Sequence, residues 1–184
     1  MSSAAKWRSA AIEWLPAERL GERPVDARLR PWLIGQGLLT TRLRASLGQR
    51  FELRLGDMWT GLLGADDKRH LAVSDTAGLF REDELCCDGR LWVLERTIMP
   101  DSTLAAHPWL AELGDSALGE TLKVLSGVDR GAYEFAWLPA DTALGRRALR
   151  GAPHAGLWAR RSRISLRSAP LAVQELFLPM MGAA

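Results

Sequence analysis

An Asp88-Gly89 dipeptide separates two runs of strand-forming residues, Phe80 to Cys87 and Arg90 to Ile98. This dipeptide favours the type I′ turn, which joins two antiparallel strands through a loop of two residues. The sequence therefore predicts a β-hairpin with residues 80–87 and 90–98 as its strands. A hairpin constrains the fold strongly, because parallel pairing would need a crossover connection of a dozen or more residues.

A second hairpin is predicted near the C-terminus, from strands at 157–167 and 171–178 joined at Ser168-Ala169. Further strands are expected at 51–55 and 133–138, where strand-forming residues cluster. Helical spacing, capping residues and proline positions predict helices at 7–15, 31–37, 40–48, shortly after residue 100 and at 116–124, with a loop or flap at 64–78. The elements show no βαβ rhythm, which indicates an α+β fold with a mainly antiparallel sheet flanked by helices.

Composition limits the classes of function. The 184 residues, 47% of them hydrophobic and 25% charged, fit a single domain spanning 1–184. A formal net charge of +2 gives no indication of nucleic-acid binding. No apolar run approaches the ~20 residues of a membrane helix. The N-terminus has Lys6 and Arg8 among its apolar residues and does not resemble a secretory signal, so a cytoplasmic protein is expected.

Metal and disulfide chemistry are not indicated. Cys86 and Cys87 are adjacent and have no CxxC or His-rich companion, and the three histidines are scattered along the chain. We therefore expect neither a zinc site nor a disulfide framework.

The first hairpin is predicted to carry two opposed arginines. Counting back from a two-residue turn pairs Arg81 with Arg96 on one face and Glu82 with Glu95 on the other, solvated face. Like charges in cross-strand register destabilise a sheet, so the arginines are easiest to explain if an anion lies near them. That anion is either a ligand or Asp83 of the same face.

Glu175 interrupts an otherwise apolar face of the last predicted strand. The predicted register places it opposite Ser162 and diagonal to Arg160. Burying such charges without partners would cost several kcal/mol, so they pair with each other or with a polar ligand. Arg161 and Arg163 alternate with these residues and are expected to face solvent.

Several blocks of sequence occur in a characteristic order between Pro31 and Pro179. They comprise Phe80-Arg81-Glu82, Leu85-Cys86-Cys87-Asp88-Gly89, Trp92, Arg96, Ile98-Met99-Pro100, Ser102-Thr103-Leu104, Leu118-Gly119, the pair Arg130 and Glu134, Gly156-Leu157-Trp158-Ala159-Arg160-Arg161-Ser162, Pro170-Leu171 and Glu175-Leu176-Phe177-Leu178-Pro179. In order and spacing together they resemble the chorismate lyase family of ubiquinone biosynthesis.

The resemblance implies an enzyme that splits chorismate into 4-hydroxybenzoate and pyruvate without a metal or organic cofactor, on a six-stranded antiparallel sheet. It also implies that Arg81 binds a substrate carboxylate and that Glu175 lies near the ring hydroxyl. Backbone amides at Leu39 and Leu118 would hold the ring carboxylate. Arg160 lies in the family's Arg-Arg-Ser block and is the first candidate for the enolpyruvyl carboxylate, with Arg96 as the alternative.

Two departures from the family pattern keep alternatives open. Asp83 and Glu84 stand where the family usually has aliphatic residues, and a carboxylate at position 83 can compete with substrate for Arg81. A lyase for another enolpyruvyl compound is therefore one alternative. A ligand-sensing domain is another, because effector domains of some bacterial regulators share this fold. Only about 30 residues precede the first matching block, which favours an enzyme, expected to be a monomer, over a regulator with a DNA-binding domain.

Overall fold

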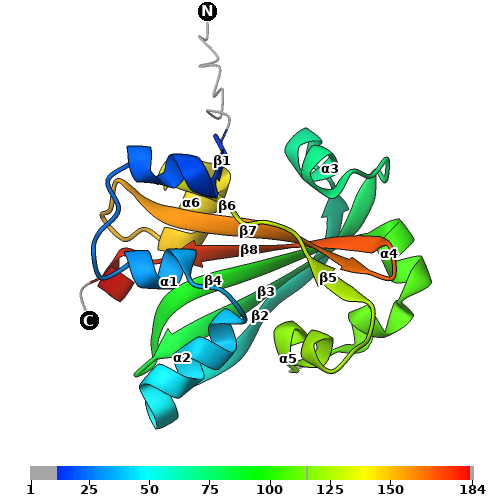
Figure 1. The fold of residues 1–184 in the computed structure, drawn as a ribbon, viewed down its shortest axis with the longest axis horizontal. Coiled ribbons are helices and arrows are strands. Elements are labelled where there is room, and N and C mark those ends of the chain that lie inside the picture. The colour runs from blue at the N-terminus through cyan, green and yellow to red at the C-terminus, as the bar shows by residue number, and fades with distance from the viewer. Residues whose placement is uncertain (1–11, 115, 183–184) are drawn as a thin grey trace, which may run out of the picture.

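One antiparallel sheet of eight strands organises the computed structural model, which describes residues 12–114 and 116–182 (Figure 1). The strands are β1 (Leu15–Pro16), β2 (Phe51–Leu62), β3 (Ala77–Cys87), β4 (Arg90–Pro100), β5 (Val128–Arg130), β6 (Glu134–Pro139), β7 (Gly156–Leu166) and β8 (Ala169–Phe177). They lie in the order β1-β6-β7-β8-β4-β3-β2, and β5 pairs with β7. The α+β class is confirmed, but the expected six strands are wrong. β1 and β5 have only two and three residues, too few to show an alternating pattern in the sequence.

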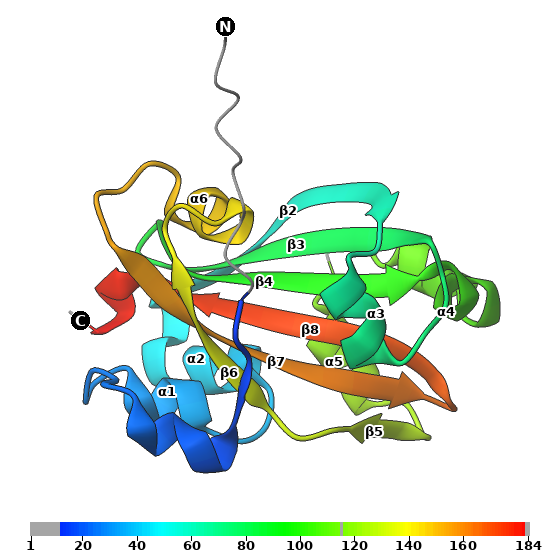
Figure 2. The ribbon, with the colours of Figure 1, turned by 90° about the horizontal axis from the view of Figure 1, so that it is seen from above.

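Helices cover both faces of this sheet (Figures 1 and 2). The α-helices are α1 (Arg30–Ile34), α2 (Leu39–Leu47), α3 (Ala65–Leu71), α4 (Asp101–Ala106), α5 (Leu118–Lys123) and α6 (Ala143–Leu149), and the 3-10 helices are η1 (Ala17–Glu22), η2 (Gly48–Arg50), η3 (Pro108–Glu112) and η4 (Pro179–Gly182). Leucines of α1, α2 and α5 pack on one face, and those of α3 and α6 pack on the other. None of the helices in the described part of the chain is long and apolar enough to cross a membrane.

The Asp88-Gly89 turn is confirmed, but the register beyond it is wrong. Both residues have positive φ (48° and 73°), as a type I′ turn requires. A β-bulge then shifts the pairing of β3 and β4, so that Leu85 lies opposite Val93 rather than Trp92. A one-residue shift moves every later side chain of one strand to the opposite face of the sheet. Arg81 therefore lies opposite Thr97, not Arg96.

The C-terminal hairpin turns one residue earlier than predicted. Its turn residues are Arg167 and Ser168, with φ of 46° and 81°, and Leu166 pairs with Ala169. The change shifts the register by two residues, which leaves every side chain on its predicted face. Glu175 consequently lies directly opposite Arg160 rather than opposite Ser162.

Two other expectations concern the N-terminal half of the chain. The segment 64–78, predicted as a loop or flap, contains α3. Asp67 accepts a hydrogen bond from the amide of Gly64, 3.1 Å away, and so stabilises the start of this helix although its sequence is polar. Most of the helix predicted at 7–15 lies outside the described residues, and its last residue, Leu15, belongs to β1.

Candidate functional site

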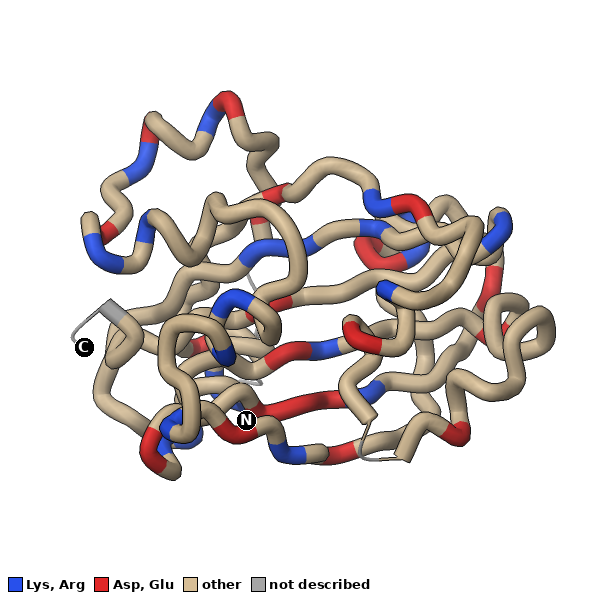
Figure 3. Tube along the Cα trace, turned by 60° about the horizontal axis from the view of Figure 1, so that its bottom comes forward, with Lys and Arg blue, Asp and Glu red and all other residues tan. Residues whose placement is uncertain are grey.

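A band of charged side chains crosses the face of the sheet that α1, α2 and α5 cover. Apolar clusters lie on both sides of the band, one including Leu85 and Phe177 and the other including Leu79 and Val173. We call this band the charged belt, and its members are Arg81, Asp83, Glu95, Arg130, Arg160 and Glu175. Figure 3 shows acidic and basic positions on neighbouring strands of the sheet. Charges with apolar residues on both sides need partners, because burial without them is costly.

Four members of the charged belt stand in one row across adjacent strands. The pairings place Asp83 of β3 opposite Glu95 of β4, Glu95 opposite Glu175 of β8, and Glu175 opposite Arg160 of β7. Opposed side chains of an antiparallel sheet have Cβ atoms about 4.5–5.5 Å apart. Three carboxylates therefore lie side by side on one face of the sheet.

Arg81 is occupied by a carboxylate of its own strand. Its Nε and Nη2 donate to Oδ2 and Oδ1 of Asp83 at 2.8 and 2.9 Å, and Nη2 also donates to the carbonyl of Ser116 at 2.9 Å. Both side chains are almost completely buried. The anion that the sequence places near Arg81 is, in this structure, Asp83, which was one of the two alternatives.

Arg160 forms an ion pair with Glu175 and also binds the end of α1. Its Nε and Nη2 donate to the Glu175 carboxylate, while Nη1 donates to the carbonyls of Leu33 at 3.1 Å and Gly35 at 2.6 Å. Tyr133 adds a cation–π contact, its ring centre 4.3 Å from the guanidinium carbon. Burial lowers the pKa of Arg160, but the charge of Glu175, the hydrogen bonds to Glu175 and the smaller effects of Tyr133 and Glu95 together raise it above its usual value. Arg160 is a cation that fixes both Glu175 and α1.

Glu95 is the central carboxylate of the row, and sequence reasoning missed it. The expectation that Glu95 faces solvent opposite Glu82 is wrong, because the bulge turns it onto the face of Arg81 and Glu175, where it is 9% exposed. Among the described residues no cation pairs with it, since the neighbouring guanidinium groups bind Asp83 and Glu175. Burial, followed by repulsion from Glu175 and Asp83, raises the pKa of Glu95 to about 8.

Two further polar side chains of this face, those of Arg130 and Thr97, have no carboxylate partner among the described residues. Arg130 of β5 donates from Nη1 to the hydroxyl of Ser162 at 2.7 Å and lies 3.4 Å from that of Tyr133. Thr97, opposite Arg81, is completely buried, and its hydroxyl has no hydrogen-bond partner in the described part of the chain. A buried polar atom without a partner is uncommon and points to a bound water or ligand.

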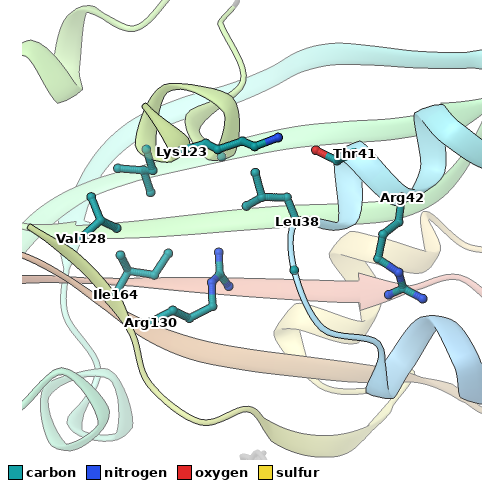
Figure 4. Close-up of a pocket in the computed structure, with 10 residues that line it drawn as sticks. Leu38, Thr41, Arg42, Lys123, Val128, Arg130 and Ile164 are labelled. Carbon is teal, nitrogen blue, oxygen red and sulfur yellow. The ribbon is translucent and has the colours of Figure 1, made fainter. Parts of the chain in front are cut away.

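A pocket of about 400 Å³ opens beside Arg130, a size typical of small-molecule sites. Its walls come from α2, α5, β5 and β7 (Figure 4), and its lining residues are Gly37, Leu38, Thr41, Arg42, Gly119, Leu122, Lys123, Val128, Arg130 and Ile164. Leu39 and Leu118 are the first residues of α2 and α5, so their amides have no acceptor within the helix. Their side chains are buried, and it is their neighbours Leu38 and Gly119 that line the pocket.

The row Ser162, Val173, Thr97 and Arg81 leads across the sheet from this pocket. Arg130 contacts the first residue of the row, and Arg81 is the last. The pocket and the charged belt are thus parts of one face, although Arg81, Glu175 and Arg160 are not among the residues that line this pocket.

The opposite face of the sheet holds separate ion pairs. Glu82 accepts from Arg96 at 2.8 Å and from Arg147 at 2.7 Å, so Arg96 is not part of the charged belt. Arg161 was expected in solvent, but it is 5% exposed and donates to Glu134 at 2.6 Å. The prediction failed because α3 covers this part of the sheet and supplies a second partner, Asp66.

Among residues 12–114 and 116–182, no three His, Cys, Asp or Glu side chains are placed to hold a metal ion. Cys86 and Cys87 are both buried free thiols.

The protein is similar to a family of enzymes over nearly its whole length. Residues 9–182 match the family described as chorismate lyase. The chain is 32% identical over 170 residues to the chorismate pyruvate-lyase of Erwinia tasmaniensis, with 92% of this chain and 87% of that protein covered. It is 37% identical over 174 residues to the probable chorismate pyruvate-lyase of Shewanella amazonensis, with 92% and 88% covered.

Solved structures with a similar fold come from transcriptional regulators. One is a GntR-family regulator from Bacillus cereus, with a TM-score of 0.55, 12% identity, and 71% of this chain and 93% of that chain covered. Another is the effector domain of PhnF from Mycobacterium smegmatis, with a TM-score of 0.55, 19% identity, and 80% and 91% covered. At these identities the similarity concerns the fold alone.

Proposed function

Because the chain belongs to the chorismate lyase family, we propose that it splits chorismate into 4-hydroxybenzoate and pyruvate, the first step of ubiquinone biosynthesis. The observation that carries this proposal is the charged belt beside a pocket that contains an arginine without a carboxylate partner among the described residues. Chorismate has two carboxylates, so its site needs at least two cationic or amide-rich anchors. Charge-assisted hydrogen bonds at such anchors contribute roughly 1.5 to 3 kcal/mol each.

Arg81 is proposed to bind the ring carboxylate together with the amides of Leu39 and Leu118. The ligand would bind at Nη1 of Arg81, which its contacts with Asp83 and Ser116 do not use, or would displace Asp83. The unpartnered hydroxyl of Thr97, opposite Arg81, supports a polar ligand at this place.

Glu175 is proposed to orient the ring hydroxyl and to assist proton movement as the ring becomes aromatic. Its orientation is fixed by Arg160, which binds the same carboxylate and the end of α1. Arg160 is therefore better suited to position Glu175 than to meet the enolpyruvyl carboxylate. Arg130 is better placed for that second carboxylate, because it lines the pocket and donates only to hydroxyl groups among the described residues.

The activity can be tested by incubating the purified protein with chorismate. We expect 4-hydroxybenzoate and pyruvate to appear in equal amounts, with no metal added. If chorismate binds without turnover, the protein is a ligand-sensing domain. This alternative is considered because effector domains of transcriptional regulators have a similar fold. If it neither binds nor reacts, another enolpyruvyl compound is the substrate, as Asp83 beside Arg81 would favour.

We further propose that residues 1–184 act as one domain and as a monomer in the cytoplasm. The single continuous sheet supports one domain. Sedimentation or light scattering of the purified chain would test the monomer.

A further inference from the structure

Glu95 lies at the centre of the charged belt, but the proposed function assigns it no role. It stands between Asp83 and Glu175 in the row of three carboxylates. The outer two are each bound by an arginine, Arg81 and Arg160 respectively. Glu95 has no such partner among the described residues, and it is nine-tenths buried.

The charged side chains that surround Glu95 come from four strands of the sheet. On the same face stand Asp83 and Arg81 from β3, Glu175 from β8, Arg160 from β7 and Arg130 from β5. If all three carboxylates of the row are ionised, these five side chains and Glu95 together sum to zero charge. If Glu95 is protonated, the sum is +1. Within the belt, only the second case leaves a net positive charge to attract an anionic ligand. Arg42 and Lys123, which line the adjoining pocket, add to this attraction in both cases.

We propose that Glu95 must carry a proton for the substrate to bind. This proposal rests on the proposed function. Protonated, Glu95 leaves the arginines in excess and can donate a hydrogen bond within the row. Ionised, it places a third negative charge beside the two carboxylates and repels the carboxylates of chorismate. Glu95 is thus a positioning residue that sets the charge of the site rather than one that reacts.

Two observations support this proposal independently. Like-charged carboxylates in one buried site share protons, because they cannot all ionise at low cost. In agreement, burial and the neighbouring carboxylates raise the pKa of Glu95 to about 8. In addition, Thr97 shares β4 and the same face with Glu95, and its buried hydroxyl also has no partner in the described part of the chain. The central strand therefore presents two unpartnered polar groups where the substrate is proposed to bind.

The test is the pH dependence of KM for chorismate, measured from about pH 6 to 9.5 in wild type and Glu95→Gln. In wild type, KM should rise about tenfold per pH unit above the pKa of Glu95. Glutamine keeps the neutral shape of the protonated acid, so the variant should keep its low-pH KM throughout this range. The control is Glu84→Gln on the opposite face, which should follow wild type. A Glu95→Gln profile that rises as steeply as wild type would overturn the proposal.

A second measurement needs no variant. Binding of 4-hydroxybenzoate to wild type, followed by calorimetry at pH 8 in buffers of different ionisation enthalpy, should take up about half a proton, because about half of the Glu95 carboxyls are ionised there. No proton uptake would overturn the proposal. If chorismate is not converted at any pH while uptake persists, the proposed reaction fails and the Glu95 proposal stands. If 4-hydroxybenzoate does not bind at all, both fail.

Discussion

At the scale of single residues, the arginines of the charged belt differ in how many of their donors are already used. All three guanidinium nitrogens of Arg160 donate hydrogen bonds, to Glu175 and to main-chain carbonyls at the end of α1. Arg81 binds Asp83 and Ser116 through Nε and Nη2, so Nη1 takes no part in these contacts. Arg130 binds only hydroxyl groups among the described residues. Because guanidinium donors in use must be released before a ligand can take them, Arg130 is the arginine best prepared to bind an anion.

Replacing Arg130 by glutamine should raise the KM for chorismate about tenfold or more, with kcat little changed. The substitution removes one charge-assisted contact, worth roughly 1.5 to 3 kcal/mol, from both bound states. The free energy of unfolding should change by less than about 1 kcal/mol, because the variant breaks no buried ion pair. Steady-state kinetics and urea unfolding would check this. Arg163→Gln, with the same loss of charge on the other face of β7, should leave KM unchanged; equal effects in both variants would argue against the role of Arg130.

Replacing Glu175 by glutamine should lower kcat by about 10²-fold or more, because assistance to proton movement typically contributes 10² to 10⁴-fold. It should also destabilise the fold by a few kcal/mol, since Arg160 loses its buried partner. Kinetics must therefore be measured well below the melting temperature of the variant. Arg81→Gln is the comparison, and it should raise KM more than it lowers kcat. If the Glu175→Gln variant has the kcat of wild type, the Glu175 carboxylate takes no part in the reaction.

At the scale of elements, the β-bulge beside Leu85 determines the composition of the site. Trp92 and Val93 both pack into the apolar cluster that includes Leu85. Two successive residues of β4 can point to one side only where the strand has an extra residue. From that point on, Glu95 and Thr97 lie on the face of the charged belt, while Arg96 lies on the opposite face and binds Glu82.

The start of β7 depends on the absence of a side chain at Gly156. A Cβ atom there would collide with the carbonyl oxygen of Leu138 and lie 2.9 Å from ring atoms of Trp137. Gly156→Ala should therefore destabilise the protein by about 1–3 kcal/mol, because the backbone of β6 must shift to make room. Gly21→Ala is the control, since a Cβ atom there meets nothing within 4 Å. Chemical denaturation would contradict this explanation if both alanine variants were equally stable.

At the scale of the whole molecule, the two faces of one sheet use charge differently. On the face covered by α3 and α6, carboxylates such as Glu82 and Glu134 are paired with arginines and hold helices to strands. On the face covered by α1, α2 and α5, the carboxylates outnumber the arginines that pair with them. Glu95 is therefore left without an arginine partner among the described residues. The stability of the fold should therefore depend on pH through Glu95.

Glu95 should make the free energy of unfolding decrease as pH rises. Its pKa is about 8 in the folded protein and about 4.3 in the unfolded chain, so between these values the folded state holds more protons. The contribution is fully present below about pH 4 and is lost as pH rises to 8, with a slope of about 1.4 kcal/mol per pH unit. Urea unfolding of wild type and Glu95→Gln from pH 5 to 8 would check this. The difference in stability between the two should grow in favour of the variant, whereas parallel curves would show that Glu95 does not titrate in this range.

Local sequence alone determined the Asp88-Gly89 hairpin, the α+β class and the placement of Arg160 and Glu175 on one apolar face, because turn chemistry and strand alternation act over a few residues. It also placed Arg81 and Asp83 side by side on one strand. Only the tertiary structure decided the register, because the bulge near Trp92 depends on what the apolar cluster can accept and not on the turn. For the same reason, the membership of Glu95 in the charged belt, the burial of Arg161 under α3 and the position of Arg130 at the pocket depend on contacts between segments far apart in the chain.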